Sequence, residues 1–395
     1  MSRLAVIETH PIQYHAPVYR ALQRDFGIAV TAIYGSDFSV EGYHDHEFGA
    51  TFAWDTDLLS GYSSTFLARA ADGGAGSDDA VTTRGLRGAL NKVAPDAVMV
   101  VGYSPRFHSQ AFLTAWRAGY PLLFRGETTD HANQRGALKT WARERALRWL
   151  YQRCGRLLYV GQRSLDHYRQ LDCPADKLVF SPYCVDTTSF RCDDAARDRF
   201  RGAARSTFGI RADKKVIVFS GKLSVRKGPD LLLRAIKRLP PDTQSQIEVL
   251  FLGSGGLQDG LQTLARKAPP TTAHFLGFQN QTQLSQYYHA ADMLVLPSLL
   301  SETWGLVVND ALHHGLPCIV SDAVGCAPDL IENGVTGAVF ESGSEESLAR
   351  TINKVLPLTD LAETRVKCRE KVADYTVPRA AEGIARAFRD IVHSG

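Results

Sequence analysis

The sequence predicts an α/β protein made of two Rossmann-like domains, each a doubly wound parallel sheet, that face each other across a cleft. Short runs rich in valine, isoleucine and leucine alternate with longer helical patterns, as in parallel sheets buried on both faces. This alternation occurs twice along the chain. The length of 395 residues also exceeds the roughly 250–300 residues at which single cores stop growing.

The predicted elements follow this alternation in chain order. The expected strands are Leu4–Ile7, Ile28–Tyr34, Ala97–Val101, Pro121–Phe124, Leu157–Val160, Val216–Ser220, Glu248–Leu252, His274–Leu276, Met293–Leu296, Cys318–Val320 and Gly337–Phe340. The expected helices are Ala16–Asp25, Ser109–Ala118, Gly136–Cys154, Pro229–Leu239, Thr282–Ala290, Leu306–His314 and Val377–His393. Each strand run is nearly continuous in apolar residues, whereas each helical segment carries the longer period of an amphipathic helix.

Two stretches lack clear periodicity and help to divide the chain. The segment 181–212 holds Pro182 and many charges, so the break between domains is expected there. We expect residues 1–190 to form an N-terminal Rossmann-like domain and residues 191–376 a C-terminal one. The last helix, within 377–394, is expected to cross back to the first domain. Residues 41–90 contain a glycine-rich run, Ala71–Ser77, and are expected to form a long loop.

Composition narrows the class of protein. The net charge of +3 shows no strong basic excess of the kind that a dedicated nucleic-acid binder carries. Seven cysteines occur without a C-x-x-C pair, which favours reduced thiols in a cytoplasmic protein over a zinc cluster or a disulfide framework. No run of ~18 apolar residues occurs, so no membrane-spanning helix is expected.

The first candidate site follows the strand predicted at Val216–Ser220. Within Gly221–Gly228, three cations, Lys222, Arg226 and Lys227, lie between two glycines. Fixed positive charge beside open backbone at a helix start suits a diphosphate. A basic surface turn is the alternative for such a loop taken alone.

A second glycine-rich turn, Gly253-Ser254-Gly255-Gly256, also follows a predicted strand. Its backbone N–H groups could meet a phosphate or a base, although glycines at such places often only make turns. The turn lacks the spacing and acidic partner of a dinucleotide-binding fingerprint, which disfavours NAD.

The third candidate site has two acids. Glu302 follows the strand Met293–Leu296, and Asp310 lies eight residues further on. With Ser301 as cap and a helix from about Thr303, the two carboxyls would share one helix face, two turns apart. In the alternative interpretation, Glu302 only stabilises the helix dipole and Asp310 is solvated.

These motifs together resemble the retaining glycosyltransferases of family 4, or group 1, which have the GT-B fold. The chain carries E-x7-D at Glu302 and Asp310 where the family has E-x7-E. The resemblance spans about Val216 to Phe340. Its other motifs are the loop Gly221–Gly228, Ala290-Ala291-Asp292, Gly315-Leu316-Pro317-Cys318-Ile319-Val320, Asn333-Gly334-Val335-Thr336-Gly337 and the earlier segment Pro182–Phe190.

The resemblance implies that residues 191–376 bind the donor and residues 1–190 the acceptor. Lys227 would neutralise the donor diphosphate, and Lys222 would share that work at a position where the family usually has arginine. Glu302 would contact the donor sugar. Asp310 would stand where a second glutamate contacts the ribose hydroxyls. The other implied donor-binding residues are Gly221, Gly253, Ser254, Thr303, Trp304, Gly305 and Leu306, the last four through backbone.

The N-terminal half matches the family less well. His10, Gln13 and His15 follow the first strand and could bind an acceptor or a donor phosphate, or could be buried structural residues. The family often has a histidine near the sugar after its fourth strand. In the stretch Phe124–His131 here, Glu127 could take that catalytic place and Arg125 could line the active site, or either could cap a helix or form an ion pair.

The activity expected from the resemblance is transfer of a hexosyl or related sugar from a nucleotide sugar to an acceptor hydroxyl, with retention of anomeric configuration. No cofactor or metal is implied, since the chain has no Asp-x-Asp cluster for a divalent ion with phosphates. The acceptor could be a sugar, a lipid-linked sugar or a small natural product. The basic, tryptophan-containing helix Gly136–Cys154 could lie on an anionic membrane at its inner face, although packing against the sheet is preferred.

Two other functions stay open. One is a nucleotide-sugar epimerase of the same fold, which would alter the donor without any acceptor. The other is a binding protein with a degenerate site, supported only by Lys222 and Asp310 at positions where the family has arginine and glutamate. The sequence does not decide the nucleotide, the sugar, the acceptor, the linkage or the oligomeric state.

Overall fold

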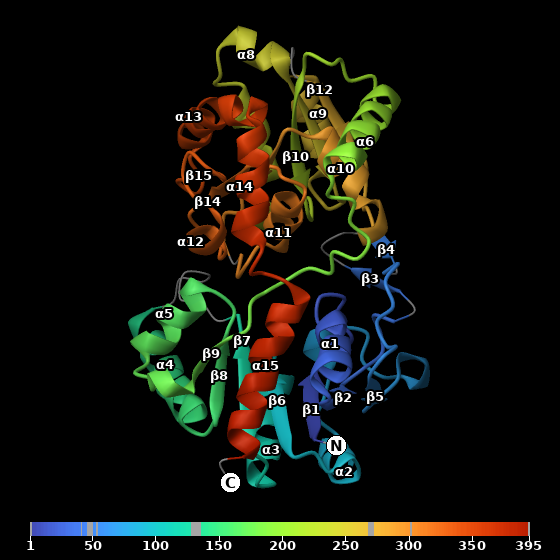
Figure 1. The fold of residues 1–395 in the computed structure, drawn as a ribbon, viewed down its shortest axis with the longest axis vertical. Coiled ribbons are helices and arrows are strands. Elements are labelled where there is room, and N and C mark those ends of the chain that lie inside the picture. The colour runs from blue at the N-terminus through green and yellow to red at the C-terminus, as the bar shows by residue number, and fades with distance from the viewer. Residues whose placement is uncertain are drawn as a thin grey trace.

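The computed structural model describes residues 2–40, 42–45, 50–52, 54–127, 136–267, 272–300 and 302–393. These residues form two lobes, one above the other in Figure 1, and each lobe is built around a parallel sheet. The lower lobe has seven strands in its sheet and the upper lobe has six. The predicted fold class, two doubly wound parallel-sheet domains, is therefore confirmed.

The lower lobe contains the first half of the chain. Its sheet has the order β5-β2-β1-β6-β7-β8-β9, and every described pairing in it is parallel. The strands are β1 (Arg3–Glu8), β2 (Ala29–Tyr34), β5 (Ser63–Phe66), β6 (Ala97–Val101), β7 (Leu122–Gly126), β8 (Arg156–Tyr159) and β9 (Leu178–Phe180). The helices are α1 (Ala16–Phe26), α2 (Leu86–Val93), α3 (Arg106–Arg117), α4 (Ala137–Gln152) and α5 (Gln162–Gln170). This order places the carboxyl ends of β1, β6 and β7 side by side at the edge that faces the upper lobe.

The upper lobe repeats the design with a sheet of order β12-β11-β10-β13-β14-β15. Its strands are β10 (Lys215–Ser220), β11 (Ile247–Leu252), β12 (Thr272–Phe275), β13 (Met293–Leu296), β14 (Cys318–Ser321) and β15 (Gly337–Phe340). Its helices are α6 (Asp194–Thr207), α7 (Pro229–Ile236), α8 (Pro241–Gln246), α9 (Gln258–Arg266), α10 (Leu284–Ala290), α11 (Leu306–His313), α12 (Ala327–Leu330), α13 (Glu345–Val355) and α14 (Ala362–Val372). The strand order changes direction at β10 and β13, which is where ligands bind in open parallel sheets.

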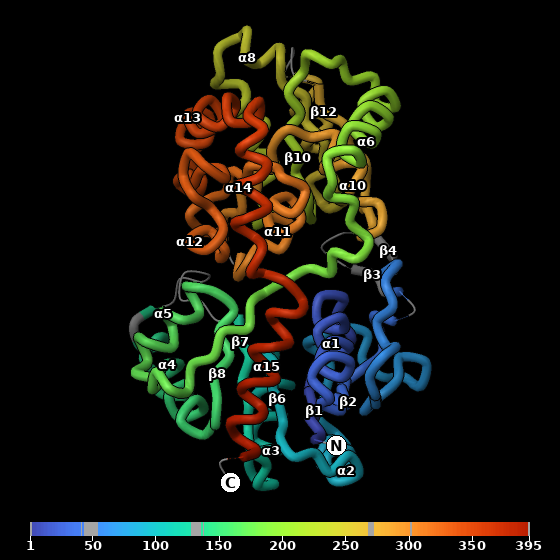
Figure 2. The backbone as a smooth tube through the Cα atoms, in the orientation of Figure 1, coloured from blue at the N-terminus to red at the C-terminus, as the bar shows by residue number. Residues whose placement is uncertain are grey.

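The last helix, α15 (Val377–Val392), lies in the lower lobe (Figure 2). Its buried residues Ile384 and Phe388 share one core cluster with Leu4 of β1. Gly383 is required for this packing because a Cβ there would lie 2.0 Å from the carbonyl oxygen of Phe180. The chain thus passes between the lobes twice, and the two passages pair at the bridge between Val185 and Thr376.

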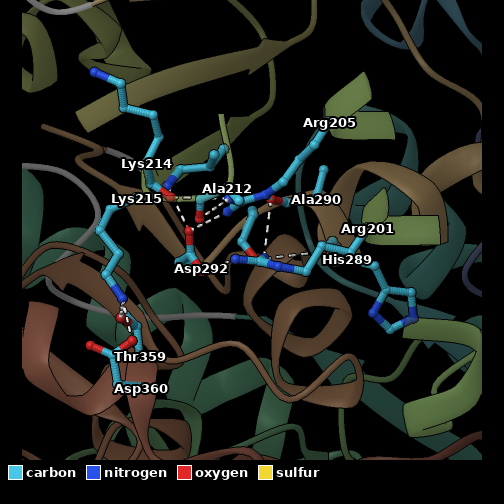
Figure 3. Close-up of polar contacts among 12 residues, drawn as sticks. Arg201, Arg205, Ala212, Lys214, Lys215, His289, Ala290, Asp292, Thr359 and Asp360 are labelled. Atoms are coloured by element: carbon cyan, nitrogen blue, oxygen red, sulfur yellow. Dashed lines mark hydrogen bonds and ion pairs between the residues drawn. The ribbon is translucent and has the colours of Figure 1, made fainter. Parts of the chain in front are cut away.

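Helix α6 forms inside the stretch where the sequence showed little apolar periodicity. Its inward face is held by charge: Arg201 and Arg205 each donate to one carboxylate oxygen of Asp292 at 2.7 Å (Figure 3). The backbone N–H of Val216 donates to the same carboxylate, also at 2.7 Å. Asp292 therefore connects α6 to β10 and β13. Because arginines stand on the inward face of α6, the sequence lacks the apolar period that would have predicted this helix.

Residues 41–90 were expected to be a loop, and this expectation is wrong for much of their described part. They contain β5, α2 and a small antiparallel pair, β3 (Tyr43–Asp45) with β4 (Ala50–Phe52). The glycine-rich run begins with a short 3-10 helix, Ala70–Asp72. The signal was weak because β5 and α2 are short and polar.

Helix α4 packs Leu147, Leu150 and Tyr151 into the lower core, which agrees with the preferred interpretation of this helix. Leu138 and Trp141 remain 77% and 57% exposed, so contact with a membrane stays a prediction. Among the helices in the described ranges, none is both long and apolar enough to cross a bilayer. All seven cysteines are free thiols, and a cytoplasmic location stays a prediction.

Candidate active site

The loop Gly221–Gly228 after β10, called the cation loop below, packs against the segment that follows β13. Gly228 has φ +61°, and a Cβ there would lie 2.6 Å from the carbonyl oxygen of Pro297. The backbone N–H of Leu299 donates to the carbonyl oxygen of Arg226 at 2.8 Å. These contacts bring the 3-10 turn Val225–Lys227 beside Glu302.

Glu302 is the buried centre of a charge cluster. The ammonium group of Lys227 donates to its Oε2 atom, and the hydroxyl group of Ser298 donates to the same atom at 2.9 Å. The guanidinium of Arg226 lies 3.9 Å from that oxygen. Two cations therefore face one carboxylate, and fixed positive charge of this kind suits a diphosphate group.

Glu302 does not start a helix, so the prediction that it shares one helix face with Asp310 is wrong. Helix α11 begins at Leu306 after Gly305, whose φ of +99° favours glycine. The preceding residues pair instead with the loop after β14, since Gly325 N–H donates to Glu302 O at 2.9 Å and Cys326 N–H donates to Trp304 O at 2.9 Å. The predicted cap, Ser301, lies outside the described residues.

Asp310 is buried in α11 and is not solvated. Its side chain has an oxygen, Oδ1, without a hydrogen-bond partner, and burial raises its pKa to about 8. Asp310 lies within electrostatic range of Tyr14 in the lower lobe, since burial and the charge of Asp310 both raise the pKa of Tyr14. A ribose hydroxyl group could donate a hydrogen bond to this unpartnered oxygen, and this contact stays a prediction.

The glycine turns after β10 and β11 interlock by backbone contact. A Cβ at Gly253 would lie 1.9 Å from the carbonyl oxygen of Gly221. The N–H of Gly221 donates to Leu252 O at 2.9 Å and that of Gly253 donates to Gly277 O at 2.7 Å. Both N–H groups are therefore paired within the protein, and donor contacts at Gly221 and Gly253 stay predictions. A donor contact at Ser254, which is half-buried, stays a prediction.

The side chain of Trp304 belongs to the packing between the lobes. It is 3% exposed, its indole N–H donates to Asn309 at 2.8 Å, and its ring stacks 6.1 Å from the ring of Tyr183. Gly161 leaves room for this ring, since a Cβ there would lie 2.3 Å from it. Only the backbone of Trp304 is left to meet a donor, as the sequence analysis expected.

A cavity of about 350 Å³ lies at the carboxyl ends of β1, β6 and β7 and reaches Thr303 of the upper lobe. The polar and charged residues that line it are Glu8, Thr9, His10, His15, Asp78, Tyr103, Ser104, His108, Arg125, Glu127 and Thr303. The structure thus brings His10, His15, Arg125 and Glu127 together, as predicted for an active-site region. Gln13 is buried but is not part of this lining.

Glu8 and His15 form a buried pair at one wall of the cavity. His15 Nδ1 lies 2.6 Å from Glu8 Oε1, and the hydroxyl group of Tyr19 donates to that oxygen at 2.6 Å. Burial alone raises the pKa of Glu8, but the charge and hydrogen bonds of His15 and Tyr19 outweigh it, and the pKa is lowered. Glu8 Oε2 and His15 Nε2 have no hydrogen-bond partner.

A second pair, His10 and Asp78, lies nearby with 2.8 Å between His10 Nδ1 and Asp78 Oδ1. Burial raises the pKa of Asp78, but the hydrogen bond and charge of His10, with smaller contributions from His108 and Thr9, together outweigh burial and lower the pKa. His108 has its Nδ1 atom 3.0 Å from the Ser104 carbonyl oxygen, while its Nε2 atom is unpartnered. Burial lowers the pKa of His108, so its imidazole is neutral at physiological pH.

Glu127 connects the two lobes. The hydroxyl group of Thr303 donates to its Oε2 atom at 2.7 Å, and the hydroxyl group of Tyr183 donates to Oε1. Arg125 is turned away from this contact: it donates to Pro182 O at 3.0 Å and lies over the Tyr183 ring at 5.3 Å. Arg125 thus holds the segment that crosses between the lobes, so its acceptor contact stays a prediction that competes with this structural role.

Sequence reasoning missed Glu8, Asp78 and His108. A signal existed for Glu8, a carboxylate at the end of a largely apolar strand, but not for the other two, which come from a short 3-10 helix, Asp78–Ala80, and from α3. Residues Thr128–His131, included in the search for a catalytic histidine, lie outside the described residues. Within the ranges that the structure covers, no group of three histidine, cysteine or acidic residues could hold a metal ion.

Family models match most of both lobes. Residues 200–374 match the model described as "Glycosyl transferases group 1", and residues 62–184 match the model described as "Glycosyl transferase 4-like domain". The first match contains the cation loop, Glu302 and Asp310. The second contains Glu127 and the segment that begins the crossing between the lobes.

Curated relatives match over part of their length. The D-inositol 3-phosphate glycosyltransferase of Mycolicibacterium smegmatis is 34% identical over 195 residues, which is 48% of this chain and 43% of the relative. The protein of that name from Streptomyces griseus is 34% identical over 172 residues, 41% of this chain and 36% of the relative. The matched region therefore spans less than half the length of these relatives.

Solved structures match over the whole chain. Sucrose-phosphate synthase from Thermosynechococcus elongatus has a TM-score of 0.71 at 16% identity and covers 100% of both chains. HepE of Anabaena, solved in complex with UDP and glucose, has a TM-score of 0.68 at 19% identity and covers 98% of this chain and 100% of its own. At these identities the likeness shows a shared fold.

Proposed function

We propose that this chain, which belongs to the group 1 glycosyltransferases with the GT-B fold, transfers a sugar from a nucleoside-diphosphate sugar to an acceptor hydroxyl group. The observation that carries the proposal is the cluster of half-buried Lys227 and Arg226 around buried Glu302, at the carboxyl end of β10 and beside the start of α11. Such a cluster supplies positive charge where a leaving diphosphate would develop negative charge.

The donor lies across this cluster in the proposed complex. Lys227 and Arg226 stabilise the diphosphate, together with the first N–H groups of α11, which have no partner within the helix. Glu302 then shares Lys227 with the diphosphate and accepts hydroxyl groups of the sugar. Asp310 receives the ribose hydroxyls at its unpartnered oxygen. Since a neighbour of this fold was solved with UDP and glucose, UDP is the first nucleotide to test.

The acceptor occupies the cavity of the lower lobe, on the other side of Thr303. Closure of the lobes over both substrates excludes water, which would otherwise hydrolyse the donor. The acceptor oxygen forms a bond to the anomeric carbon, while the bond from that carbon to the diphosphate breaks, and the proton of the acceptor hydroxyl group passes to the departing diphosphate. We propose retention of anomeric configuration from the family alone, because no pair of residues in the site requires it.

Thermal unfolding with a panel of UDP, GDP, ADP and dTDP tests the donor site. A ligand present at a hundred times its dissociation constant should stabilise the folded protein by about 2.7 kcal/mol. We expect a clear shift with one nucleotide, its loss in Lys227→Ala, and its survival in Lys237→Ala, a matched control on the exposed end of α7. A shift equal in both variants would contradict the role of Lys227.

The same protein separates the open alternatives. Incubation with the selected nucleotide sugar and no acceptor should leave the sugar configuration unchanged by NMR, whereas an epimerase would convert it. Turnover with a panel of acceptors that is lost in Glu302→Gln would support the transferase. Nucleotide binding without turnover of any acceptor would favour a binding protein.

A further inference from the structure

The acceptor cavity contains acids but offers no uncommitted cation among the described residues. Its carboxylates are Glu8, Asp78 and Glu127, and its guanidinium is Arg125. Arg125 donates to the backbone carbonyl groups of Ser181 and Pro182. His10 and His15 are each paired with a carboxylate through Nδ1. The formal charge of the described lining is therefore negative or zero in every protonation state of these two histidines.

Three buried atoms of the cavity lining have no hydrogen-bond partner: Glu8 Oε2, His108 Nε2 and His15 Nε2. The first two are hydrogen-bond acceptors, and the third accepts when the His15 ring is neutral. Glu8 Oε2 is a buried carboxylate oxygen without a partner. His108 donates from Nδ1 to the Ser104 carbonyl oxygen and is neutral, so its unpartnered Nε2 atom also accepts. Both side chains are more than nine-tenths buried, and both line the cavity. Only a ligand that brings hydrogen-bond donors can satisfy them.

From this lining we infer that the cavity takes an uncharged, hydroxyl-rich acceptor, such as an unmodified sugar ring or cyclitol, and discriminates against its phosphate ester. The inference rests on the proposed transferase function and adds the chemical class of its acceptor. Hydroxyl groups donate to Glu8 and His108, whereas a phosphate dianion only accepts and would lie beside carboxylates that repel it. The volume of about 350 Å³ lies in the range of about 300–1,000 Å³ typical of small-ligand sites.

Ligand-detected NMR on the full chain tests the inference without a known donor. The probes are myo-inositol, glucose and N-acetylglucosamine, each matched with a phosphate: inositol 3-phosphate, glucose 6-phosphate and N-acetylglucosamine 6-phosphate. We expect saturation transfer to at least one neutral compound and at least about tenfold weaker binding of its phosphate. Detectable binding of no neutral compound, or stronger binding of a phosphate, would overturn the inference.

A charge reversal provides the matched pair of variants. Asp78 has a side chain that is 50% exposed, so Asp78→Lys should fold, and circular dichroism checks this. We define the affinity ratio as the affinity for a phosphate ester divided by the affinity for its unphosphorylated counterpart. At physiological salt this ratio should be about tenfold higher in Asp78→Lys than in the wild type. Asp79→Lys changes the charge equally at an exposed neighbour that is not part of the cavity lining. An unchanged ratio in Asp78→Lys, or an equal change in Asp79→Lys, would also overturn the inference.

The two proposals fail separately. If a nucleotide raises the melting temperature but the protein binds phosphorylated probes more tightly, only the proposed acceptor class is refuted. A protein that shifts with no nucleotide refutes the transferase, and with it the reason to regard the cavity as an acceptor site.

Discussion

The buried carboxyl of Asp310 makes the stability of the protein depend on pH. Its pKa is about 8 in the folded chain, against an ordinary value of 3.8, because burial disfavours the charged form. The folded state therefore keeps a proton that the unfolded state has lost between these two values. Stability from this group is complete below about pH 4, falls as pH rises, and stops changing above about pH 8.

Asp310→Asn removes this dependence, because an amide imitates the neutral acid and does not titrate. Each pKa unit corresponds to about 1.4 kcal/mol, so the wild-type carboxyl costs roughly 4 kcal/mol at pH 7 relative to pH 4. For a domain of about 150–250 residues, 1 kcal/mol shifts the melting temperature by about 2–4 °C. The melting temperature of the variant should therefore rise relative to that of the wild type by about 3–5 °C for each pH unit between 5 and 8.

Differential scanning calorimetry of both proteins across this pH range measures the gain. The pH slope is the decisive quantity, since any fixed cost of placing an amide in the site cancels from it. Asp259→Asn, an equivalent change at an exposed residue in the first turn of α9, serves as the control and should follow the wild type. Parallel melting profiles for Asp310→Asn and the wild type would refute the assignment of a neutral buried acid.

Two further substitutions test contacts that hold the donor lobe together, each read by urea unfolding. Asp292→Ala should cost about 3–5 kcal/mol because it leaves Arg205 buried without a partner, whereas Asp360→Ala, at an exposed ion pair in Figure 3, should cost at most about 1 kcal/mol. Equal losses of unfolding free energy in the two variants would contradict the role of Asp292 in holding α6. Gly253→Ala should cost at least about 1–3 kcal/mol, because its φ is +143° and its new Cβ would overlap a backbone oxygen of the neighbouring loop. Gly256→Ala, with nothing within 4 Å, should stay within about 0.5 kcal/mol, and a similar loss in both would refute the interlocked turns.

Most strands of both sheets could be predicted because they are buried and nearly continuous in apolar residues, whereas β5 and β9, the two edge strands of the lower sheet, were missed. Met293–Leu296 and Gly337–Phe340 have the predicted bounds. Two of the elements that were missed lack this apolar signal. Helix α6 is anchored by arginine and aspartate, and β5 is short, polar and at the edge of its sheet.

The donor site was partly visible in the sequence. The cation loop, Glu302 and Asp310 carry a recognisable spacing, so their proximity to the carboxyl ends of neighbouring strands could be expected. The start of α11 could not be placed from the sequence, because the pairing of Glu302 and Trp304 with Gly325 and Cys326 depends on a loop some twenty residues away.

By itself the sequence determined the two-sheet fold class, the family resemblance and the identity of the charges that a diphosphate would meet. These follow from local apolar patterns and short motifs. Only the tertiary structure decided that Lys227 pairs with Glu302, that Asp310 is buried and neutral, and that Glu8 and His108 share one cavity. The physical reason is that burial and electrostatic pairing depend on atoms contributed by several strands and both lobes, and no local pattern records those distances.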